Sequence, residues 1–389
     1  MSVVLLIASF ATAQIPCSPS IIPNAALFVN WPQFQYDAAH TGCNPYESVL
    51  KPSNVGNLAV KWQHLGEPGG SSFSGSVVAD RTLYAVAYGG HGDYTSSLGA
   101  LNPSTGTILW TYSTNIPFDD LTSPAVGKGL VYVGASDNNV DALDSKTGAL
   151  AWQYSTSGSI YAPPTVVNGV VYVGSADSNV YALNAATGAL IWQYATGAGV
   201  DASPAVSNGM VYAASADNKL YALNAGTGQL VWSYTMGGSA SSAPSVASGK
   251  VYVGSDQVYA LNASTGALVW TYPADSRFAT SAFAKGVLYI ASRQGSVYAV
   301  NASTGALIWN HDGVAFFLHS PVVADGVVYV TSGDFPAFAA LDAATGALLW
   351  SSQGVNDSSS LTVVNGMVYV GSQDPDAVGH LYAFSLNGQ

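Results

Sequence analysis

Charged residues are scarce in this chain of 389 residues: lysine and arginine number 10, aspartate and glutamate 22, and the formal net charge is −12. Binding to nucleic acid or to an anionic membrane surface depends on clustered lysine and arginine, so this composition argues against both. Long hydrophobic runs are missing too. The apolar run near the N-terminus has about eight residues, whereas a spanning helix needs about twenty. We expect no nucleic-acid partner and no membrane span.

The N-terminal sequence MSVVLLIASFATAQ places this apolar run before Ala11-Thr12-Ala13, the small-x-small pattern of a secretory cleavage site. Residues 1–13 are therefore predicted to form a signal peptide, although no lysine or arginine precedes the run. The mature chain then begins near Gln14. We expect export to the periplasm or to the extracellular space.

Cysteine is almost absent: only Cys17 and Cys43 occur, both in the N-terminal region. In an exported protein the two thiols can form a disulfide, which would close a loop of about 26 residues and stabilise the fold by up to about 3 kcal/mol. The alternatives are two unpaired thiols, or loss of Cys17 with the leader.

The motifs of several enzyme classes are also missing. The sequence has no G-x-S-x-G elbow, P-loop, H-E-x-x-H or C-x-x-C-H haem site. Asp119 and Asp120 are adjacent carboxylates, but neighbours in sequence on a loop are weak evidence for acid–base catalysis. A hydrolase whose carboxylates meet only on folding stays open.

One pattern dominates what the sequence does contain. Close copies of VYALNAATGALIW, Val180 to Trp192, recur along the chain and end in a tryptophan every 38 to 42 residues. A second element such as APPTVVNGVVYVGS precedes each copy, and turn signals occur at Asn-Gly, Asp-x-Asn and Asn-x-x-Thr-Gly. One period therefore predicts four short strands. The seven tryptophans are Trp110, Trp152, Trp192, Trp232, Trp270, Trp309 and Trp350.

Four strands in about 40 residues, repeated many times, predict an all-β fold: an eight-bladed β-propeller of four-stranded antiparallel blades. After Ser358 only three strands follow, whereas NLAVKWQH, with Trp62, matches a fourth strand that lacks its first three. We predict that residues 58–64 complete this C-terminal blade, so that an N-terminal strand closes the ring without a free edge. The propeller then spans residues 58–389 and follows an N-terminal extension, residues 14–57.

The repeated unit A-x-[DN]-x-x-T-G-x-x-x-W resembles the tryptophan-docking motif of the PQQ-like, or quinoprotein-type, β-propeller family over residues 58–388. The segment WPQFQYDAAHTGCNPYE, followed by KPSNVGNLAVKW, resembles the N-terminal region of exported members. The resemblance implies that each tryptophan packs structurally against the next blade. The family includes pyrroloquinoline quinone dehydrogenases and non-catalytic scaffolds, such as the propeller lipoprotein of the outer-membrane barrel assembly machine, so it indicates the fold more than the activity.

Departures from the repeat suggest where ligands bind. The interval from the second-strand tyrosine to the end of the third strand is 9 or 11 residues in blades 2 to 6, but 12 in blade 7, 15 in blade 8 and 17 in blade 1. These neighbouring blades are expected to place their long loops on one face, where oxygen and imidazole donors could hold a cation or a polar ligand. The alternative is a purely structural role, in which these residues only form turns. The candidates are His91, Asp93, Tyr94, Asp334, Phe335, Asp374, Asp376 and His380.

The connections that enter each innermost strand are expected to open on the same face, around the mouth of the central channel. Their aromatic and charged residues could form a binding funnel, or could equally plug the channel. These candidates are Phe118, Asp119, Asp120, Tyr161, Asp201, Arg277, Phe278, Phe316, Phe317 and His319.

Three functions compete. The first is a non-enzymatic exported binding or scaffold module with a protein or glycan partner in the cell envelope. The second is a quinoprotein dehydrogenase that uses pyrroloquinoline quinone and calcium. The third is a secreted carbohydrate-binding or carbohydrate-active protein whose aromatic funnel holds a glycan.

The residues that the resemblance would require for the quinone argue against the second function. Its dehydrogenases typically hold the quinone under two adjacent cysteines, whereas Cys17 and Cys43 are far apart. Their calcium site uses a glutamate, but the only glutamates here, Glu47 and Glu67, precede the first blade. We therefore predict that neither the quinone nor calcium is a cofactor.

Overall fold

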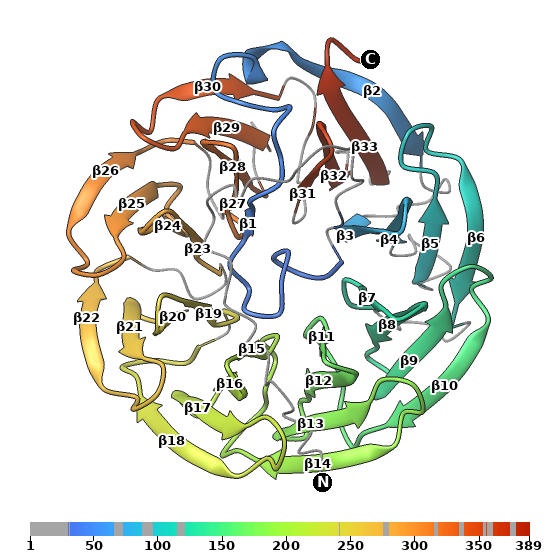
Figure 1. Cartoon of the computed structure of the whole chain (residues 1–389), viewed down its shortest axis with the longest axis vertical. Helices are drawn as coiled ribbons and strands as arrows, with labels where there is room; N and C mark the ends of the chain where they lie inside the picture. Colours follow the sequence, from blue (N-terminus) through green and yellow to red (C-terminus); the bar gives the residue numbers. More distant parts are fainter. Residues whose placement is uncertain are drawn as a thin grey trace, which may run out of the picture.

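The computed structural model describes residues 30, 32–65, 73–87, 96–114, 121–240, 242–274, 280–314, 318–333, 338–352, 355, 361–373 and 379–389. Eight sheets stand radially around a central axis and form an eight-bladed β-propeller (Figure 1). The predicted all-β fold, with four antiparallel strands in each blade, is confirmed. No helix in these ranges has the length and apolar character needed to cross a membrane.

Blades 1 to 4 follow one another around the ring in chain order. Blade 1 contains β3 (Phe73–Ala79), β4 (Thr82–Ala87), β5 (Ser97–Leu101) and β6 (Ile108–Ser113). Blade 2 contains β7 (Ala125–Gly127), β8 (Leu130–Gly134), β9 (Asn139–Asp144) and β10 (Leu150–Ser155). Blade 3 contains β11 (Thr165–Val167), β12 (Val170–Gly174), β13 (Asn179–Asn184) and β14 (Leu190–Ala195). Blade 4 contains β15 (Ala205–Ser207), β16 (Met210–Ser215), β17 (Lys219–Asn224) and β18 (Leu230–Thr235).

Blades 5 to 8 continue the ring in the same way. Blade 5 contains β19 (Ser245–Ala247), β20 (Lys250–Gly254), β21 (Val258–Asn262) and β22 (Leu268–Tyr272). Blade 6 contains β23 (Ala282–Ala284), β24 (Val287–Ala291), β25 (Val297–Asn301) and β26 (Leu307–His311). Blade 7 contains β27 (Val322–Ala324), β28 (Val327–Thr331), β29 (Phe338–Asp342) and β30 (Leu348–Ser351). Blade 8 contains β31 (Thr362–Val364), β32 (Met367–Gln373), β33 (Gly379–Leu386) and β2 (Leu58–Leu65).

The ring closes through blade 8 as predicted. β2 from the N-terminal part of the chain pairs antiparallel with β33, with Leu58 opposite Leu386 and Trp62 opposite Ala383. The two ends of the propeller therefore meet in one sheet, at the top of Figure 1. Closure gives every blade two neighbours, which explains why the second strands are buried on both faces.

Each repeat packs its tryptophan on the next blade. The Trp192 indole donates its Nε1 hydrogen to the Ala225 carbonyl in blade 4 at 2.9 Å. Tyr172, on the second strand of the same blade, donates to the same carbonyl at 3.2 Å and lies 5.9 Å from the Trp192 ring. The Asn-x-x-Thr-Gly turn is thus the acceptor that joins neighbouring blades. The structural role that the resemblance implied for this motif matches these contacts.

The up-and-down strand order defines two faces of the ring. Turns between first and second strands, such as Asn168-Gly169, lie on the same face as the Asn-x-x-Thr-Gly turns, and we call this the turn face. Loops between second and third strands lie on the other face with the connections between blades, and we call this the loop face.

Candidate functional site

Residues 32–57 are here called the N-terminal segment: they begin inside the ring of innermost strands, pass β27 and then cross to the outer edge beside β30 before the chain enters β2 (Figure 1). Their only regular elements are β1 (Cys43–Asn44), which pairs parallel with β27 of blade 7, and the 3-10 helix η1 (Val55–Asn57). The sequence predicted an extension here but no role for it. Instead of lying outside the propeller, this segment covers the inner edges of the blades.

An innermost strand has one unpaired edge, and its backbone N–H groups need acceptors. The N-terminal segment supplies them. The carbonyl of Ala38 accepts from Val206 N of blade 4 at 2.5 Å, and the carbonyl of Ala39 accepts from Val246 N of blade 5 at 2.8 Å. The same repeat position is bound in the other blades: Val126 N to Pro32 O, Val166 N to Gln33 Oε1, Phe283 N to Thr41 O, and Val323 N to Gly42 O.

Blades 1 and 8 are contacted through side chains. Asn30 Oδ1 accepts from Asp80 N of blade 1 at 3.1 Å, and Asn44 Nδ2 donates to the Val363 carbonyl of blade 8 at 2.9 Å. Asn30 and residues 32–44 therefore touch all eight blades. This set of bonds fixes the N-terminal segment on the axis of the propeller.

His40 anchors the middle of this segment. Its ring is fully buried; Nδ1 lies 3.1 Å from the Pro244 carbonyl and Nε2 lies 3.0 Å from Thr165 Oγ1. Because a carbonyl only accepts, Nδ1 carries the proton and Nε2 accepts from the threonine hydroxyl. Burial lowers the His40 pKa to about 4. The imidazole is therefore neutral at pH 7 and joins blades 3 and 5.

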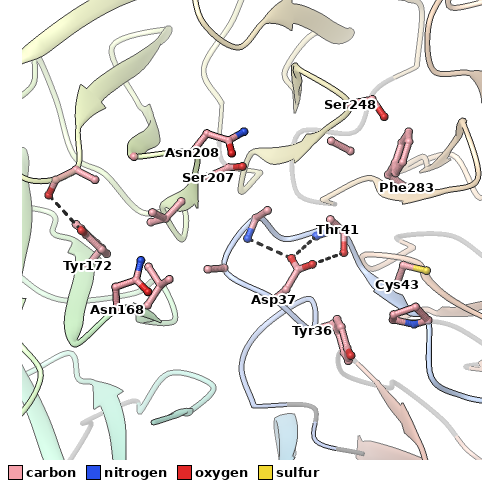
Figure 2. Close-up of a pocket in the computed structure, with 18 of the residues that line it drawn as sticks. Tyr36, Asp37, Thr41, Cys43, Asn168, Tyr172, Ser207, Asn208, Ser248 and Phe283 are labelled. Atoms are coloured by element: carbon pink, nitrogen blue, oxygen red, sulfur yellow. Dashed lines mark hydrogen bonds between the residues drawn. The ribbon is translucent and has the colours of Figure 1, made fainter. Parts of the chain in front are cut away.

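A pocket of about 670 Å³ lies between the N-terminal segment and the turn-face ends of blades 3 to 6 (Figure 2). Its rim carries the exposed first turns of blades 3, 4 and 5, at Asn168, Asn208 and Ser248. The remaining lining residues are Tyr36, Asp37, Ala38, Ala39, Thr41, Cys43, Pro45, Tyr46, Val167, Tyr172, Val206, Ser207, Gly209, Ala225, Ala247 and Phe283.

Asp37 contributes the one carboxylate in this pocket. Its Oδ1 accepts from Ala39 N at 3.1 Å and from Thr41 N at 3.0 Å, while Oδ2 accepts from Thr41 Oγ1 at 2.7 Å (Figure 2). The carboxylate therefore holds a tight turn, and desolvation raises its pKa. Burial also raises the pKa of the Tyr36 phenol, and the nearby Tyr46 and Asp37 add to the shift.

Most of the site residues that the sequence suggested lie outside the described part of the chain, so their convergence stays a prediction. These are His91, Asp93, Tyr94, Phe118, Asp119, Asp120, Arg277, Phe278, Phe316, Phe317, Asp334, Phe335, Asp374 and Asp376.

Four candidates can be placed. Tyr161, 56% exposed, and the exposed Asp201 occupy equivalent positions in the loop-face connections that enter blades 3 and 4. Partial burial raises the Asp201 pKa. His319 is half-buried, and its backbone N–H donates to the Thr331 carbonyl. His380 is buried within β33, where its ring stacks on Tyr382 with centroids 5.5 Å apart.

Cys43 and Glu47 are two buried residues of the N-terminal segment. Cys43 is buried, lines the pocket and is disulfide-bonded. Its predicted partner, Cys17, lies outside the described residues, so this pairing stays a prediction. Glu47 is buried: Oε1 accepts from Val49 N and Leu50 N, and Oε2 accepts from Gly366 N of blade 8. Its carboxylate is thus committed to holding the N-terminal segment on the ring.

Eight four-stranded blades joined by tryptophan–turn contacts define a PQQ-like repeat β-propeller. The chain belongs to the family described as outer membrane protein assembly factor BamB, whose model matches residues 59–163, 157–276 and 258–389. No curated protein sequence matches the chain significantly.

Solved structures share the fold. BamB from Moraxella catarrhalis is 22% identical, with a TM-score of 0.67 over 84% of this chain and 97% of its own. The quinohemoprotein alcohol dehydrogenase ADHIIG from Pseudomonas putida HK5 is 17% identical, with a TM-score of 0.77 over 97% of this chain and 83% of its own. The quinohemoprotein alcohol dehydrogenase from Comamonas testosteroni is 17% identical, with a TM-score of 0.77 over 92% and 81%. At these identities the likeness concerns the fold alone.

Proposed function

We propose that this chain is a non-enzymatic exported propeller that binds a partner protein of the cell envelope through its loop face. The observation that carries the proposal is the asymmetry of the ring. The N-terminal segment is bound to the innermost strands, and the pocket beside it lies on the turn face. On the loop face, Tyr161 and Asp201 present exposed side chains from adjacent blades.

The family description supports a binding role, because an assembly factor works through contacts with other proteins. The proposed partner is a protein, and a glycan is the alternative that follows if the aromatic side chains on the loop face bind sugar. The predicted signal peptide places both partners outside the cytoplasm.

The quinoprotein alternative asks the chain to supply a glutamate to calcium. Glu47 does not fit this task, because its carboxylate is buried in the contact with blade 8, does not line the pocket on the turn face and already accepts from three backbone N–H groups. Glu67 lies outside the described residues. We therefore propose no step that uses the quinone.

Site-specific photocrosslinking tests the binding face. A crosslinking amino acid at position 161 or 201 should capture one discrete envelope protein, whereas the same group at Ser104, an exposed residue on the turn face, should not. Equal capture from both faces would contradict the proposal.

Reconstitution with pyrroloquinoline quinone and calcium tests the dehydrogenase alternative. It should give no dye reduction with alcohols or aldoses, and turnover would favour the dehydrogenase.

A further inference from the structure

The pocket on the turn face offers one negative charge and no positive one. Its lining contains Asp37 but no lysine, arginine or histidine. Among the residues that the structure describes, Asp37 forms no ion pair; its partners are two backbone amides and one hydroxyl, all neutral. Hydrogen bonds of this kind orient a carboxylate without neutralising it. A ligand with a phosphate or carboxylate group would meet repulsion here and find no cation to bind.

The geometry of the Asp37 carboxylate leaves room for one more partner. Oδ1 accepts two hydrogen bonds and Oδ2 accepts one from Thr41 Oγ1, while the nearby His40 amide also favours the ionised carboxylate. An ionised carboxylate has about four acceptor positions, so Oδ2 can take a further donor or face a positive charge. The net charge of −12 adds a long-range attraction for cations.

The pocket lining includes aromatic and small side chains. Tyr36, Tyr46 and Phe283 line the pocket, together with Ala38 and Ala39. The face of an aromatic ring attracts a positive charge within about 6 Å, most effectively where water is excluded. A pocket of about 670 Å³ is far larger than a single metal ion needs and is in the range of sites for small organic ligands.

We propose that this pocket binds a small organic cation, an ammonium ion with apolar substituents, whose charge lies beside Asp37 and whose substituents contact the tyrosines and Phe283. The site is on the turn face and shares no residue with the loop face, so it stands or falls independently of the proposed function. Asn168, Asn208 and Ser248 at the rim would contact the polar part of such a ligand.

Two probes of nearly equal shape test the role of charge. Choline carries a quaternary ammonium, and 3,3-dimethylbutan-1-ol replaces its nitrogen with carbon and has no charge. Titration calorimetry on the full mature chain should show saturable choline binding, with the neutral isostere about tenfold weaker or worse. Glucose serves as a third probe for a site that recognises hydroxyl groups.

Variants then locate the binding. Asn208→Lys places a positive charge on the rim, and the repeat itself tolerates lysine there, since Lys128 and Lys285 occupy the equivalent turn position with φ near that of Asn208. Choline binding should weaken at least tenfold. The control, Ser104→Lys, adds the same charge in blade 1, at a turn position that is Lys146 in blade 2, and should leave binding unchanged.

Asp37→Asn removes the charge itself and should weaken choline binding by a similar factor, provided that the thermal midpoint shows a folded chain. Asn208→Lys decides the matter if this variant does not fold. Equal binding of choline and its isostere, preference for glucose, no choline binding at 10 mM, or equal effects of the two lysine variants would each overturn the proposal.

Discussion

At the residue scale, one tryptophan differs from the rest. In seven blades the indole Nε1 donates to a turn carbonyl of the next blade at 2.9 to 3.2 Å. Trp350 of blade 7 has no such acceptor among the described residues, and the buried Tyr329 hydroxyl beside it is also unbonded. Blade 8 explains both, since its third and fourth strands come from opposite ends of the chain and no turn joins them. The rings of Phe338 and Phe384 pack around Trp350 instead, with centroids 5.0 and 5.6 Å from that of the indole.

This difference predicts unequal costs for one substitution. Trp309→Phe removes a hydrogen bond to the Ala343 carbonyl as well as indole packing, whereas Trp350→Phe removes packing alone. We expect Trp309→Phe to lower the free energy of unfolding by about 1 kcal/mol more than Trp350→Phe. Urea denaturation of the two variants measures this difference. Identical midpoints and slopes would show that the hydrogen bond adds nothing.

His40 gives the fold a pH dependence. Its pKa falls from 6.5 in the unfolded chain to about 4 in the folded protein. Between these values the unfolded state binds more protons, so the free energy of unfolding decreases as the pH falls from 6.5 to 4. Once the pH is well below 4, the free energy of unfolding is lower by about 3 kcal/mol from this group.

Comparison with His40→Gln isolates this contribution. Between pH 7 and pH 4 the wild type should lose up to about 3 kcal/mol more stability than the variant. Asp37, whose raised pKa acts in the opposite sense, is present in both proteins and cancels from the difference. Denaturation curves at several pH values provide the measurement, and parallel pH profiles would show that His40 is not held neutral.

At the scale of elements, the Asn-x-x-Thr-Gly turns lie close against the tryptophan of the preceding blade. Gly188, in blade 3, has φ 72°. A Cβ at this position would lie 2.6 Å from the ring of Trp152 in blade 2. Gly209, in the turn between β15 and β16, has φ 74° but nothing within 4 Å. Both glycines therefore allow a left-handed backbone, but only Gly188 also makes room for an indole.

Alanine substitution separates these two effects. Gly209→Ala should cost about 1 kcal/mol, the price of a side chain in the left-handed region. Gly188→Ala should cost at least about 2 kcal/mol more, because overpacking against the indole adds to this strain. Thermal denaturation of the pair measures the difference. Equal losses would mean that the Trp152 ring moves aside freely.

The repeat explains why most elements could be predicted from the sequence. The side chain of Asn184 and the positive φ that Gly188 allows specify a turn, and their copies specify the same turn in other blades, so each blade supports the prediction for its neighbours. Trp62 likewise predicted the closing strand. The N-terminal segment occurs once and binds largely through backbone carbonyls, such as those of Ala38 and Ala39, which every residue has. No turn was predicted from the Asp37-x-x-x-Thr41 spacing, and nothing in the sequence pointed to the pocket.

At the scale of the whole molecule, closure depends on a single strand pairing. β33 joins β32 to β2 and buries Leu381, Tyr382 and Phe384. Removing residues 379–389 should lower the free energy of unfolding by more than about 5 kcal/mol, since each buried apolar side chain contributes about 1.5–3 kcal/mol. Denaturation of this truncated chain tests the prediction. The control lacks only Gly388 and Gln389 and should unfold almost like the wild type, and equal stability of the two chains would contradict the closure account.

The N-terminal segment also has a consequence for assembly. Most interfaces between blades repeat the same tryptophan–turn contact, so this contact does not by itself distinguish one of these blades from another. The contacts of Asn30, Pro32, Gln33, Ala38, Ala39, Thr41, Gly42 and Asn44 meet blades 1 to 8 in turn. A ring with another number of blades would leave some of these groups without a partner. Asn30 and the N-terminal segment together thus provide one binding group for each of eight blades, so their contacts match a ring of this number.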